Sequence, residues 1–436
     1  MTMRERIKYL RIRIGPAVWA AVFFCLAFAS RGSAMYRYTL EPALSVGWSY
    51  DDNIGLVREN TQSDLVTTVT PSLGLEAASR TTGLRLTYRP SYLKYQRYSE
   101  RDTFQHYLDL NSWHMFNKYL RLGFTTSYIK SDDPFEESVL DENLVRDRYS
   151  YQINRSQLRM DYRFGPGDTL TAGYRHTLAR YDNPGSNDRT DHGPFGTMTY
   201  WFDIRNGMEL GYDFTRHGFK ENQLGIRDED VNAHSFRAGY IRRFSHRTQG
   251  SIRYGLSTRD SKDLEEDYWV HDGSVGLDHA FSETLRLNTH AGAFKRTRFF
   301  RGDETGGRYG AQLGKTFQNR SLSFHAERGW AEDYLAEDRR GFTRYWTVGA
   351  NFNQELSDEL GFRSGVSYRR NDRDGQTAND SFYQANAGLR WNFHRDYALG
   401  LDYRFAKRIS DNRTDEYVNN RVTLSVSWRR PFRWQP

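Results

Sequence analysis

The sequence contains a single cysteine, Cys25, among its 436 residues. Cys25 lies near the amino terminus, so the rest of the chain has none. That absence excludes disulfide bonds, thiol nucleophiles and cysteine-based metal sites from the remainder of the chain. A Gly-x-Ser-x-Gly element and a phosphate-binding glycine loop are also missing from the sequence. We therefore expect no enzyme, no cofactor and no metal site.

Long apolar segments are missing beyond the first 34 residues. Mean hydropathy is −0.82, and no later segment offers the roughly 20 apolar residues that a transmembrane helix needs. Tyr, Phe and Trp nevertheless make up 15% of the chain. So many aromatic residues are unexpected in a soluble chain this polar. They suit a β-barrel, whose lipid-facing surface is a thin apolar band edged by aromatic girdles.

The first 34 residues have the three parts of a secretory signal peptide. Basic residues between Arg4 and Arg13 precede the apolar run Pro16–Ala29, and Gly32-Ser33-Ala34 offers small residues for cleavage. The run is too short to span a membrane as an anchor helix, so we expect cleavage after Ala34. The prediction is a signal peptide over 1–34 and one folded domain over 35–436.

Removing the leader also removes most of the net positive charge. The whole chain has 62 Lys and Arg against 55 Asp and Glu, whereas residues 35–436 hold 56 basic and 54 acidic residues. A nearly balanced chain gives no support for a nucleic-acid partner, and we expect none.

A pattern of about forty residues repeats along almost the whole chain. Each repeat holds a short polar turn, an alternating apolar–polar strand, a longer polar stretch and a second alternating strand. Examples of the first strand begin at Gly83–Tyr88, Gly207–Tyr212 and Tyr397–Tyr403. Alternation with a period of two places one class of residue on each face of a sheet. Behind an export signal it predicts an all-β fold, a single antiparallel transmembrane barrel of the Gram-negative outer membrane with about 20 strands, in the range 18–20.

The connections between the predicted strands alternate in length. Short segments such as Gly165–Asp168 and Ser357–Glu359 are the predicted periplasmic turns, and longer charged segments such as Glu221–Asp230 are the predicted extracellular loops. This arrangement places both termini in the periplasm. A soluble β-propeller also repeats near this interval. Its blades hold four short strands each, whereas the repeats here hold two strands of about 12–16 residues.

The alternation also assigns the two faces of the wall. Leu170 and Tyr174 would face lipid while Thr171 and Gly173 face the lumen, because Arg or Lys against lipid at mid-depth costs about 2–4 kcal/mol. The candidate lumen and selectivity residues on the inward face are Arg85, Arg89, Arg121, Arg175, Arg253, Arg286, Arg363, Arg369 and Arg404. Arginine binds carboxylate or phosphate with two hydrogen bonds, so one interpretation is a lumen that favours anions, including acidic sugars. The other is that inward acids pair with these arginines and only brace the wall.

The first predicted strand ends in Tyr50-Asp51-Asp52-Asn53. From the residues alone this element is either a hydrated turn at a strand end or a cation-binding loop. Followed by a periodic barrel, it resembles the β-barrel porin 2 family of Gram-negative bacteria, in which a similar element closes the first strand. The resemblance covers residues 36–436 in architecture. It implies an outer-membrane pore or scaffold linked to exopolysaccharide export, and it identifies no catalytic residue.

These observations together predict a passive outer-membrane channel for a polysaccharide or another polar, anionic solute. The alternatives are a non-conducting, lectin-like scaffold barrel that retains exopolysaccharide, and a general diffusion porin. The expected partners are outer-membrane lipid, a polysaccharide substrate and periplasmic export machinery, and the sequence does not fix the oligomeric state. A wide lumen needs a constriction, and the longest loop, 131–148, is the candidate: it either folds inward and docks its acids, Asp132 and Asp133 among them, on lumen arginines, or it stands in solvent.

Overall fold

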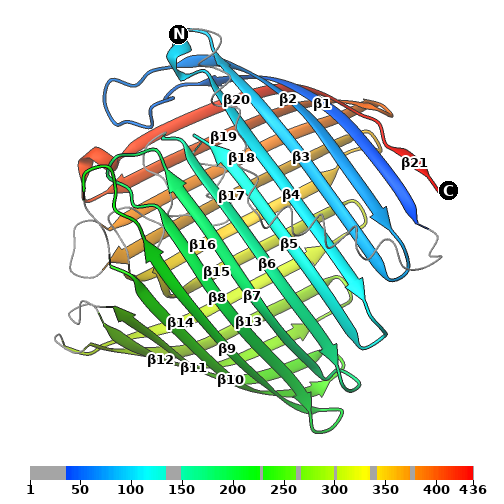
Figure 1. Ribbon diagram of the computed structural model, residues 1–436, viewed down its shortest axis with the longest axis vertical. Helices are drawn as coiled ribbons and strands as arrows, with labels where there is room; N and C mark the ends of the chain where they lie inside the picture. Colours follow the sequence, from blue (N-terminus) through cyan, green and yellow to red (C-terminus); the bar gives the residue numbers. More distant parts are fainter. Residues whose placement is uncertain are drawn as a thin grey trace.

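The computed structural model describes residues 36–133, 149–225, 229–261, 267–298, 302–333, 341–373 and 379–435. The predicted signal peptide over 1–34 lies outside these residues. Within them, long strands form one closed antiparallel barrel of 20 strands (Figure 1). The strands are β1 (Arg37–Asp51), β2 (Asp64–Ala78), β3 (Thr82–Tyr95), β4 (Thr103–Met115), β5 (Leu120–Ser131), β6 (Tyr151–Arg163), β7 (Thr169–Tyr181), β8 (Arg189–Trp201), β9 (Asn206–Phe219), β10 (Val231–Ser245), β11 (Thr248–Ser261), β12 (Tyr268–Ala280), β13 (Leu285–Arg298), β14 (Glu304–Thr316), β15 (Arg320–Asp333), β16 (Gly341–Glu355), β17 (Leu360–Arg373), β18 (Asp380–His394), β19 (Tyr397–Ser410), β20 (Tyr417–Arg429) and the short β21 (Phe432–Trp434).

The barrel closes because the last strands pair with the first. β1 runs antiparallel to β20 from Ala43–Arg429 to Asp51–Arg421, and β21 continues the same edge with Tyr38 opposite Trp434. Each other strand pairs with the next along the chain. The prediction of an all-β barrel with about 20 strands is confirmed. The helical turns Ser99–Arg101 and Arg413–Asp415 are short, and no helix among the described residues is long and apolar enough to cross a membrane.

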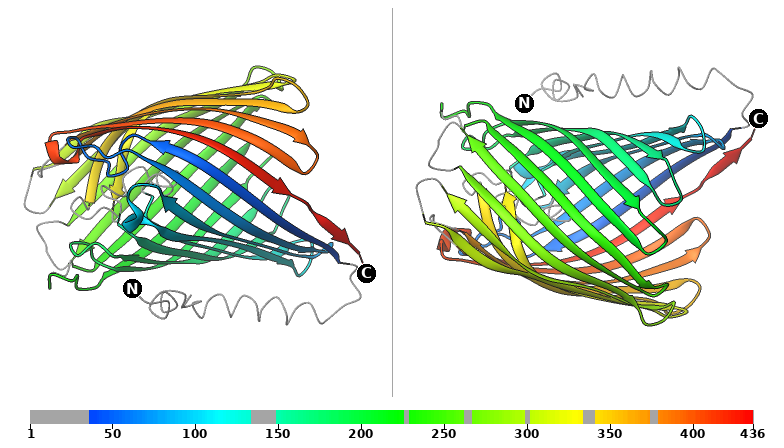
Figure 2. Two further views of the ribbon diagram at one scale, coloured as in Figure 1. Left: turned by 90° about the horizontal axis from the view of Figure 1, so that it is seen from above. Right: turned by 90° about the horizontal axis from the view of Figure 1, so that it is seen from below.

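The two ends of the barrel differ in the length of their connections. Both ends of the described chain lie at the end with the short turns, such as Arg395–Asp396 between β18 and β19 (Figure 2). The opposite end carries the longer connections, such as 52–63 between β1 and β2. We call these the turn end and the loop end. Their arrangement agrees with the predicted periplasmic turns and extracellular loops.

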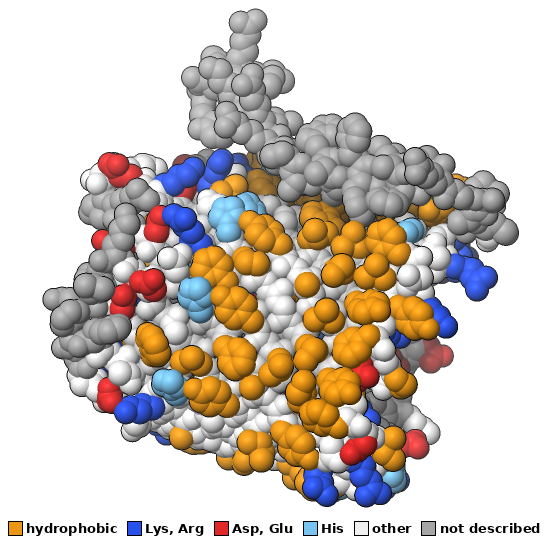
Figure 3. Space-filling model, turned by 60° about the horizontal axis from the view of Figure 1, so that its bottom comes forward, with side chains coloured by type: hydrophobic (Ala, Val, Ile, Leu, Met, Phe, Trp, Pro, Cys, Tyr) orange, Lys and Arg blue, Asp and Glu red, His pale blue; other side chains and the backbone are white. Residues whose placement is uncertain are grey.

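The outer wall carries the apolar side of each strand. Leu401 and Tyr403 are exposed on this wall, while Asp402 between them faces inward and pairs with Arg363 of β17. Figure 3 shows such side chains covering the middle of one wall, with charged side chains at its margins. The predicted assignment of faces is confirmed, because period two moves every second residue to the other side.

An aspartate directly before a descending strand closes several loop-end hairpins. Its Oδ1 accepts the backbone N–H of the last residue of the preceding ascending strand. These bonds join Asp102 to Tyr95 (2.8 Å), Asp188 to Tyr181 (3.2 Å), Asp230 to Phe219 (3.1 Å) and Asp267 to Ser261 (2.7 Å). The side chain replaces a ladder bond that the loop interrupts, as aspartate does in turns.

The inner face of the wall changes character along the barrel axis. Near the loop end it carries buried apolar side chains, including Tyr95, Tyr151, Val231 and Phe294. Towards the turn end it carries polar and charged side chains that remain open to water, such as Arg85, whose side chain is 69% exposed. The molecule therefore has its packed core inside the mouth of the barrel, and a wet vestibule below it.

Candidate lumen site

Most of the predicted lumen arginines face an acid on the adjacent strand or on the strand beyond it. The pairs are Arg85–Glu76 (3.0 Å), Arg89–Asp109 (3.8 Å), Arg175–Asp213, Arg253–Glu209 (3.5 Å), Arg286–Asp278 (3.9 Å) and Arg363–Asp402 (2.6 Å). Pairing across strands is the arrangement that braces a polar wall. The pairs are nevertheless open to water, since the side chains of Arg286 and Arg363 are 72% and 66% exposed. Exposed ion pairs contribute about 0–1 kcal/mol each, so a solute could compete for these guanidinium groups.

Several inward arginines stack on inward aromatic rings. Arg121 lies over Trp113 with 5.1 Å between the guanidinium carbon and the ring centroid. Further stacks join Arg89 to Tyr107 (5.8 Å), Arg175 to Phe195 (4.7 Å) and Arg243 to Trp201 (3.4 Å). Flat aromatic and guanidinium groups side by side offer both a stacking surface and hydrogen-bond donors.

The remaining two predicted arginines lie on the wall near the loop end. Arg369 stacks over Tyr345 at 4.6 Å and donates from Nε to Asn371 Oδ1 at 2.8 Å. Arg404 lies opposite Arg421 in the β19–β20 register. The structure therefore distributes the nine predicted arginines around the whole wall and gathers no single binding pocket from them.

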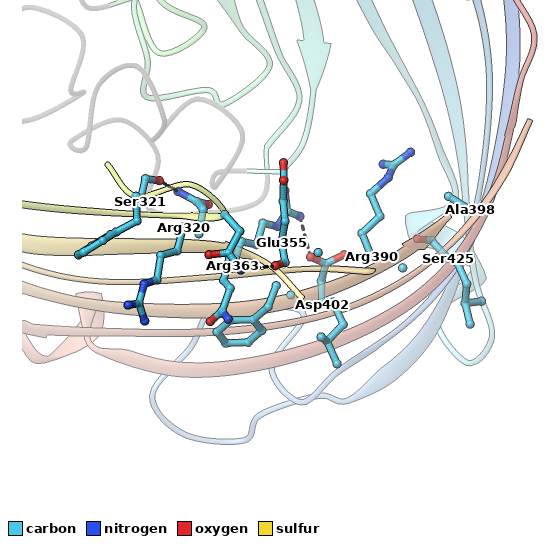
Figure 4. A pocket seen from close by; sticks show the side chains of 18 of the residues that line it. Arg320, Ser321, Glu355, Arg363, Arg390, Ala398, Asp402 and Ser425 are labelled. Carbon is cyan, nitrogen blue, oxygen red and sulfur yellow. Dashed lines mark hydrogen bonds and ion pairs between the residues drawn. The ribbon is translucent and has the colours of Figure 1, made fainter. Parts of the chain in front are cut away.

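A cavity of about 440 Å³ opens on the inner wall at the turn end of β15–β20 (Figure 4). Arg363 and Arg390 extend into it together with Glu355 and Asp402. Arg390 was not among the predicted residues, although it follows Leu389 in the same alternation that identified Arg363. Its Nε donates to Asn392 Oδ1 at 3.2 Å.

The Tyr50–Asn53 element fastens the first strand to the last at the loop end. Asp51 Oδ2 accepts from Arg421 Nε (3.2 Å) and Nη2 (3.0 Å), and its Oδ1 accepts from Asn419 Nδ2 (2.5 Å). Asp52 accepts the backbone N–H and the side-chain amide of Asn420, both at 2.7 Å. We call this contact set the seam latch.

The burial of the seam latch contradicts the interpretation of Tyr50–Asn53 as a hydrated turn. Asp51 and Asn53 are each 1% exposed, so the hydrated-turn interpretation is wrong for both residues. Tyr50 is 52% exposed, on the outer side. Protein donors occupy both carboxylate oxygens of Asp51. Among the described residues no group of three His, Cys, Asp or Glu is placed to hold a metal ion.

Hydrogen bonds from the Asn53 side chain hold the connection 52–63, between β1 and β2, against the inner wall. The Nδ2 of Asn53 donates to the carbonyls of Val57 (2.7 Å) and Val418 (2.9 Å), and its Oδ1 accepts the Val57 N–H (3.1 Å). The turn so formed holds Leu56 at φ 51°, a conformation uncommon for a bulky residue. The side-chain bonds of Asn53 therefore hold a strained turn in place.

The pinned connection places two apolar side chains inside the mouth. Ile54 is fully buried against Val66 and Tyr95 on the inner face of β2 and β3. Leu56 packs on the other side of the seam, against Ala406 and Tyr417 of β19 and β20. The connection thus spans the inner face of the seam instead of extending into solvent.

The beginning of the predicted inward loop also reaches the seam latch. Asp133, 8% exposed, accepts from Arg421 Nη1 at 2.8 Å although β5 and β20 are five strands apart around the wall. Tyr151 donates to the Asp133 carbonyl at 3.0 Å. Docking on a lumen arginine is confirmed for Asp133, whereas Asp132 instead accepts from Gln105 at 2.7 Å. Residues 134–148 of this loop lie outside the described residues.

The described loop-end part of the β15–β16 hairpin, residues 330–332 and 342–344, narrows the mouth from another side, and we call it the hairpin tip. β14 pairs with β15 only from Tyr309–Arg328 to Thr316–Ser321, so the first part of β14 lacks this neighbour. Beyond that point Trp330 and Phe342 pack on Tyr268, Val270 and Phe294 of the inner wall. By alternation Trp330 and Phe342 lie on the side of their strands that faces lipid lower down. Their contact with the inner wall therefore requires the tip to bend inward.

Charge reinforces the inward bend. Arg344 on the tip binds Glu304 of β14 at 3.0 Å, and Arg296 binds the same carboxylate at 2.7 Å. The Arg296 guanidinium also lies 4.0 Å from the centroid of the Phe342 ring. Sequence analysis did not identify this constriction, because the residues that form it come from five separate strands.

Comparison with known proteins agrees with this architecture. Residues 338–430, which cover β16–β20, match the family described as "Putative beta-barrel porin 2". That match confirms the resemblance over this part of the chain, and no curated protein matches the chain.

Solved structures resemble this chain at low sequence identity. The ferric-catecholate import receptor Fiu of E. coli K12 is 9% identical with a TM-score of 0.50, over 92% of this chain and 82% of that one. OpdL of Pseudomonas aeruginosa is 13% identical with a TM-score of 0.42, over 91% and 99% of the two chains. OccAB4 of Acinetobacter baumannii is 13% identical with a TM-score of 0.40, over 91% and 98%. The family match over residues 338–430 and the barrel fold both agree with the predicted outer-membrane β-barrel.

Proposed function

We propose that this outer-membrane barrel is a channel that passes a polar, anionic solute, with an acidic polysaccharide on its way out of the cell as the favoured substrate. The observation that carries the proposal is the open lower lumen, where exposed arginines stand beside aromatic rings. A guanidinium group binds a carboxylate with two hydrogen bonds, and a flat ring suits the apolar face of a sugar.

The exposure of the arginines to water supports a role in selecting anions, beyond bracing the wall. The guanidinium groups of Arg85, Arg286 and Arg363 are paired but more than 60% exposed. An exposed pair exchanges its partner at little cost in free energy, because water already screens it. Arg121 and Arg390 add positive charge, and among the described residues no acid lies within ion-pair distance of either.

The narrowed mouth argues against a general diffusion porin. The connection 52–63, Asp133 and the β15–β16 tip all occupy the loop end, so a solute must pass side chains that protrude from three directions. The same observation favours a second candidate, a barrel that does not conduct and holds polysaccharide at its surface. Conductance separates the two.

The test is planar-bilayer conductance of refolded residues 35–436, with ion selectivity read from the reversal potential. We expect current with anion preference, reduced by an oligogalacturonate and not by a neutral dextran oligomer. In R85E/R121E/R363E the anion preference should fall or invert. The control R205E/R247E changes charge on exposed turns and should leave selectivity near that of the wild type.

Two outcomes contradict the proposal. Anion preference that persists unaltered in R85E/R121E/R363E would show that these arginines only brace the wall. A verified folded barrel that passes no current, yet retains oligogalacturonate on a column, would establish the non-conducting scaffold instead.

A further inference from the structure

A row of polar and basic side chains crosses four strands on the lipid-facing side of the loop end. His106 of β4 lies opposite Lys130 of β5, Lys130 lies opposite Gln152 of β6, and Gln152 lies opposite Arg180 of β7. The four strands are neighbours on the front wall in Figure 1. We call these four residues the rim row. At the usual spacing between strands the row is about 14 Å long.

The rim row stands at the upper edge of the aromatic girdle. Tyr88 is hydrogen-bonded to His106 Nδ1 at 2.9 Å, and Tyr128 donates to Gln152 Oε1 at 3.3 Å. Lys130 and Arg180 are each one residue from the end of their strands. A cation so close to the strand end lies at the level of lipid headgroups, where its cost falls from about 2–4 kcal/mol at mid-depth to about 0–1 kcal/mol.

Several cations at comparable positions elsewhere on the rim are neutralised by the protein itself. Lys295 binds Asp303 at 2.7 Å, Arg216 binds Asp230 at 3.4 Å and Arg370 binds Asp372 at 2.9 Å. In the described part of the chain, no acid lies within ion-pair distance of Lys130 or Arg180.

The acids nearest to the row in sequence have other roles or positions. Asp102 accepts from Tyr92 and from the Tyr95 N–H, and Asp132 accepts from Gln105. Asp133 accepts from Arg421, and Asp182 lies in the connection after β7. The row itself contains no acid, so no acid among the described residues neutralises its positive charge.

We propose that the rim row binds the phosphate groups of a phosphorylated glycolipid in the outer leaflet. Charge complementarity commits the site to this occupant, because two cations, Lys130 on β5 and Arg180 on β7, face the headgroup layer. Gln152 between them supplies amide donors for sugar hydroxyls, and His106 adds a further polar contact. The site goes beyond the proposed channel function and does not depend on it.

The experiment measures lipid binding to refolded residues 35–436 in detergent by native mass spectrometry. The probes are a bis-phosphorylated acylated glucosamine disaccharide, its dephosphorylated form, and phosphatidylglycerol. We expect preferential binding of the bis-phosphorylated lipid, weakened roughly tenfold or more in K130Q/R180Q, since each basic residue near a membrane surface contributes appreciably to binding of anionic lipid. The matched control K295Q/R370Q removes two cations that the protein already neutralises, and it should change binding less than twofold.

The proposal is overturned if K130Q/R180Q binds the phosphorylated glycolipid as well as the wild type does. It is also overturned if phosphatidylglycerol binds equally well, because the row would then attract any anionic lipid. Heat-modifiable migration on gels verifies that each variant is folded. Conductance in phosphatidylcholine bilayers, which lack this ligand, reports on the channel independently.

Discussion

Replacing Asn53 by alanine should release the connection 52–63 from the mouth of the barrel. The side chain makes hydrogen bonds to the Val57 carbonyl, the Val57 N–H and the Val418 carbonyl. At a net contribution of about 0.5–1.5 kcal/mol for each bond, the substitution removes roughly 2–4 kcal/mol. The docked connection also holds Leu56 at positive φ, a strain of about 1–3 kcal/mol that favours release.

Burial of Ile54 and Leu56 opposes release, with about 1.5–3 kcal/mol for each side chain. The free energy that the Asn53 hydrogen bonds contribute to docking is therefore about as large as the burial energy of Ile54 and Leu56 minus the strain at Leu56. A loss of about 3 kcal/mol changes the ratio of docked to released connection by roughly a hundredfold. The wall itself should survive, because its backbone ladder is untouched.

Trypsin cleavage after Arg58 measures the released fraction, since Arg58 lies in this connection. When opening is faster than cleavage, the cleavage rate follows the open population. We expect Asn53→Ala to be cut at Arg58 about a hundredfold faster and to conduct more current than the wild type. The matched control is Asn222→Ala, which removes a similar amide, bonded to the Gly185 carbonyl at 3.0 Å, from another loop. Equal cleavage rates for Asn53→Ala and the wild type would refute the role of Asn53 as a pin.

Other substitutions test the seam, the hairpin tip and the wall. Arg421→Met should lower barrel stability by about 3–5 kcal/mol, measured by urea unfolding in micelles, because it leaves the buried Asp51 without its cation; an unchanged midpoint would contradict the seam latch. Phe342→Ala should raise conductance while gel-shift melting of the barrel changes little, and a loss of the whole barrel would show that the tip is part of the wall. Gly292→Ala should destabilise by about 1–3 kcal/mol, since its Cβ would lie 2.0 Å from the Gly273 carbonyl oxygen. Gly273→Ala, whose Cβ meets nothing within 4 Å, is the control, and equal effects of the two would contradict this reasoning.

The faces of the barrel wall could be predicted from the sequence because they follow from the alternation of apolar and polar residues within each strand. Leu401, Asp402 and Tyr403 each have a side fixed by period two, and the same rule identified arginines such as Arg363 as inward. The rule also reaches Arg390, which sequence analysis passed over. The aspartates that close the loop-end hairpins were readable as well, since each directly precedes a descending strand.

The candidate site was only partly predictable. Alternation placed the arginines on the inward face but did not choose their partners, because a partner depends on the register between strands. The Tyr50–Asn53 motif was visible, yet its buried contacts with Asn419 and Arg421 come from the opposite end of the chain. The polar run before the last strand was a signal that could have pointed to them.

The sequence by itself determined the barrel, its approximate strand number, its two faces and its two kinds of connection, because each follows from a pattern within one or two strands. Only the tertiary structure decided how the mouth is filled. Closure brings Asp51 to Arg421, and the bend of one hairpin brings Phe342 to Phe294. These contacts join residues far apart in the chain. Their free energy depends on the curvature and register of the whole wall, which no single strand encodes.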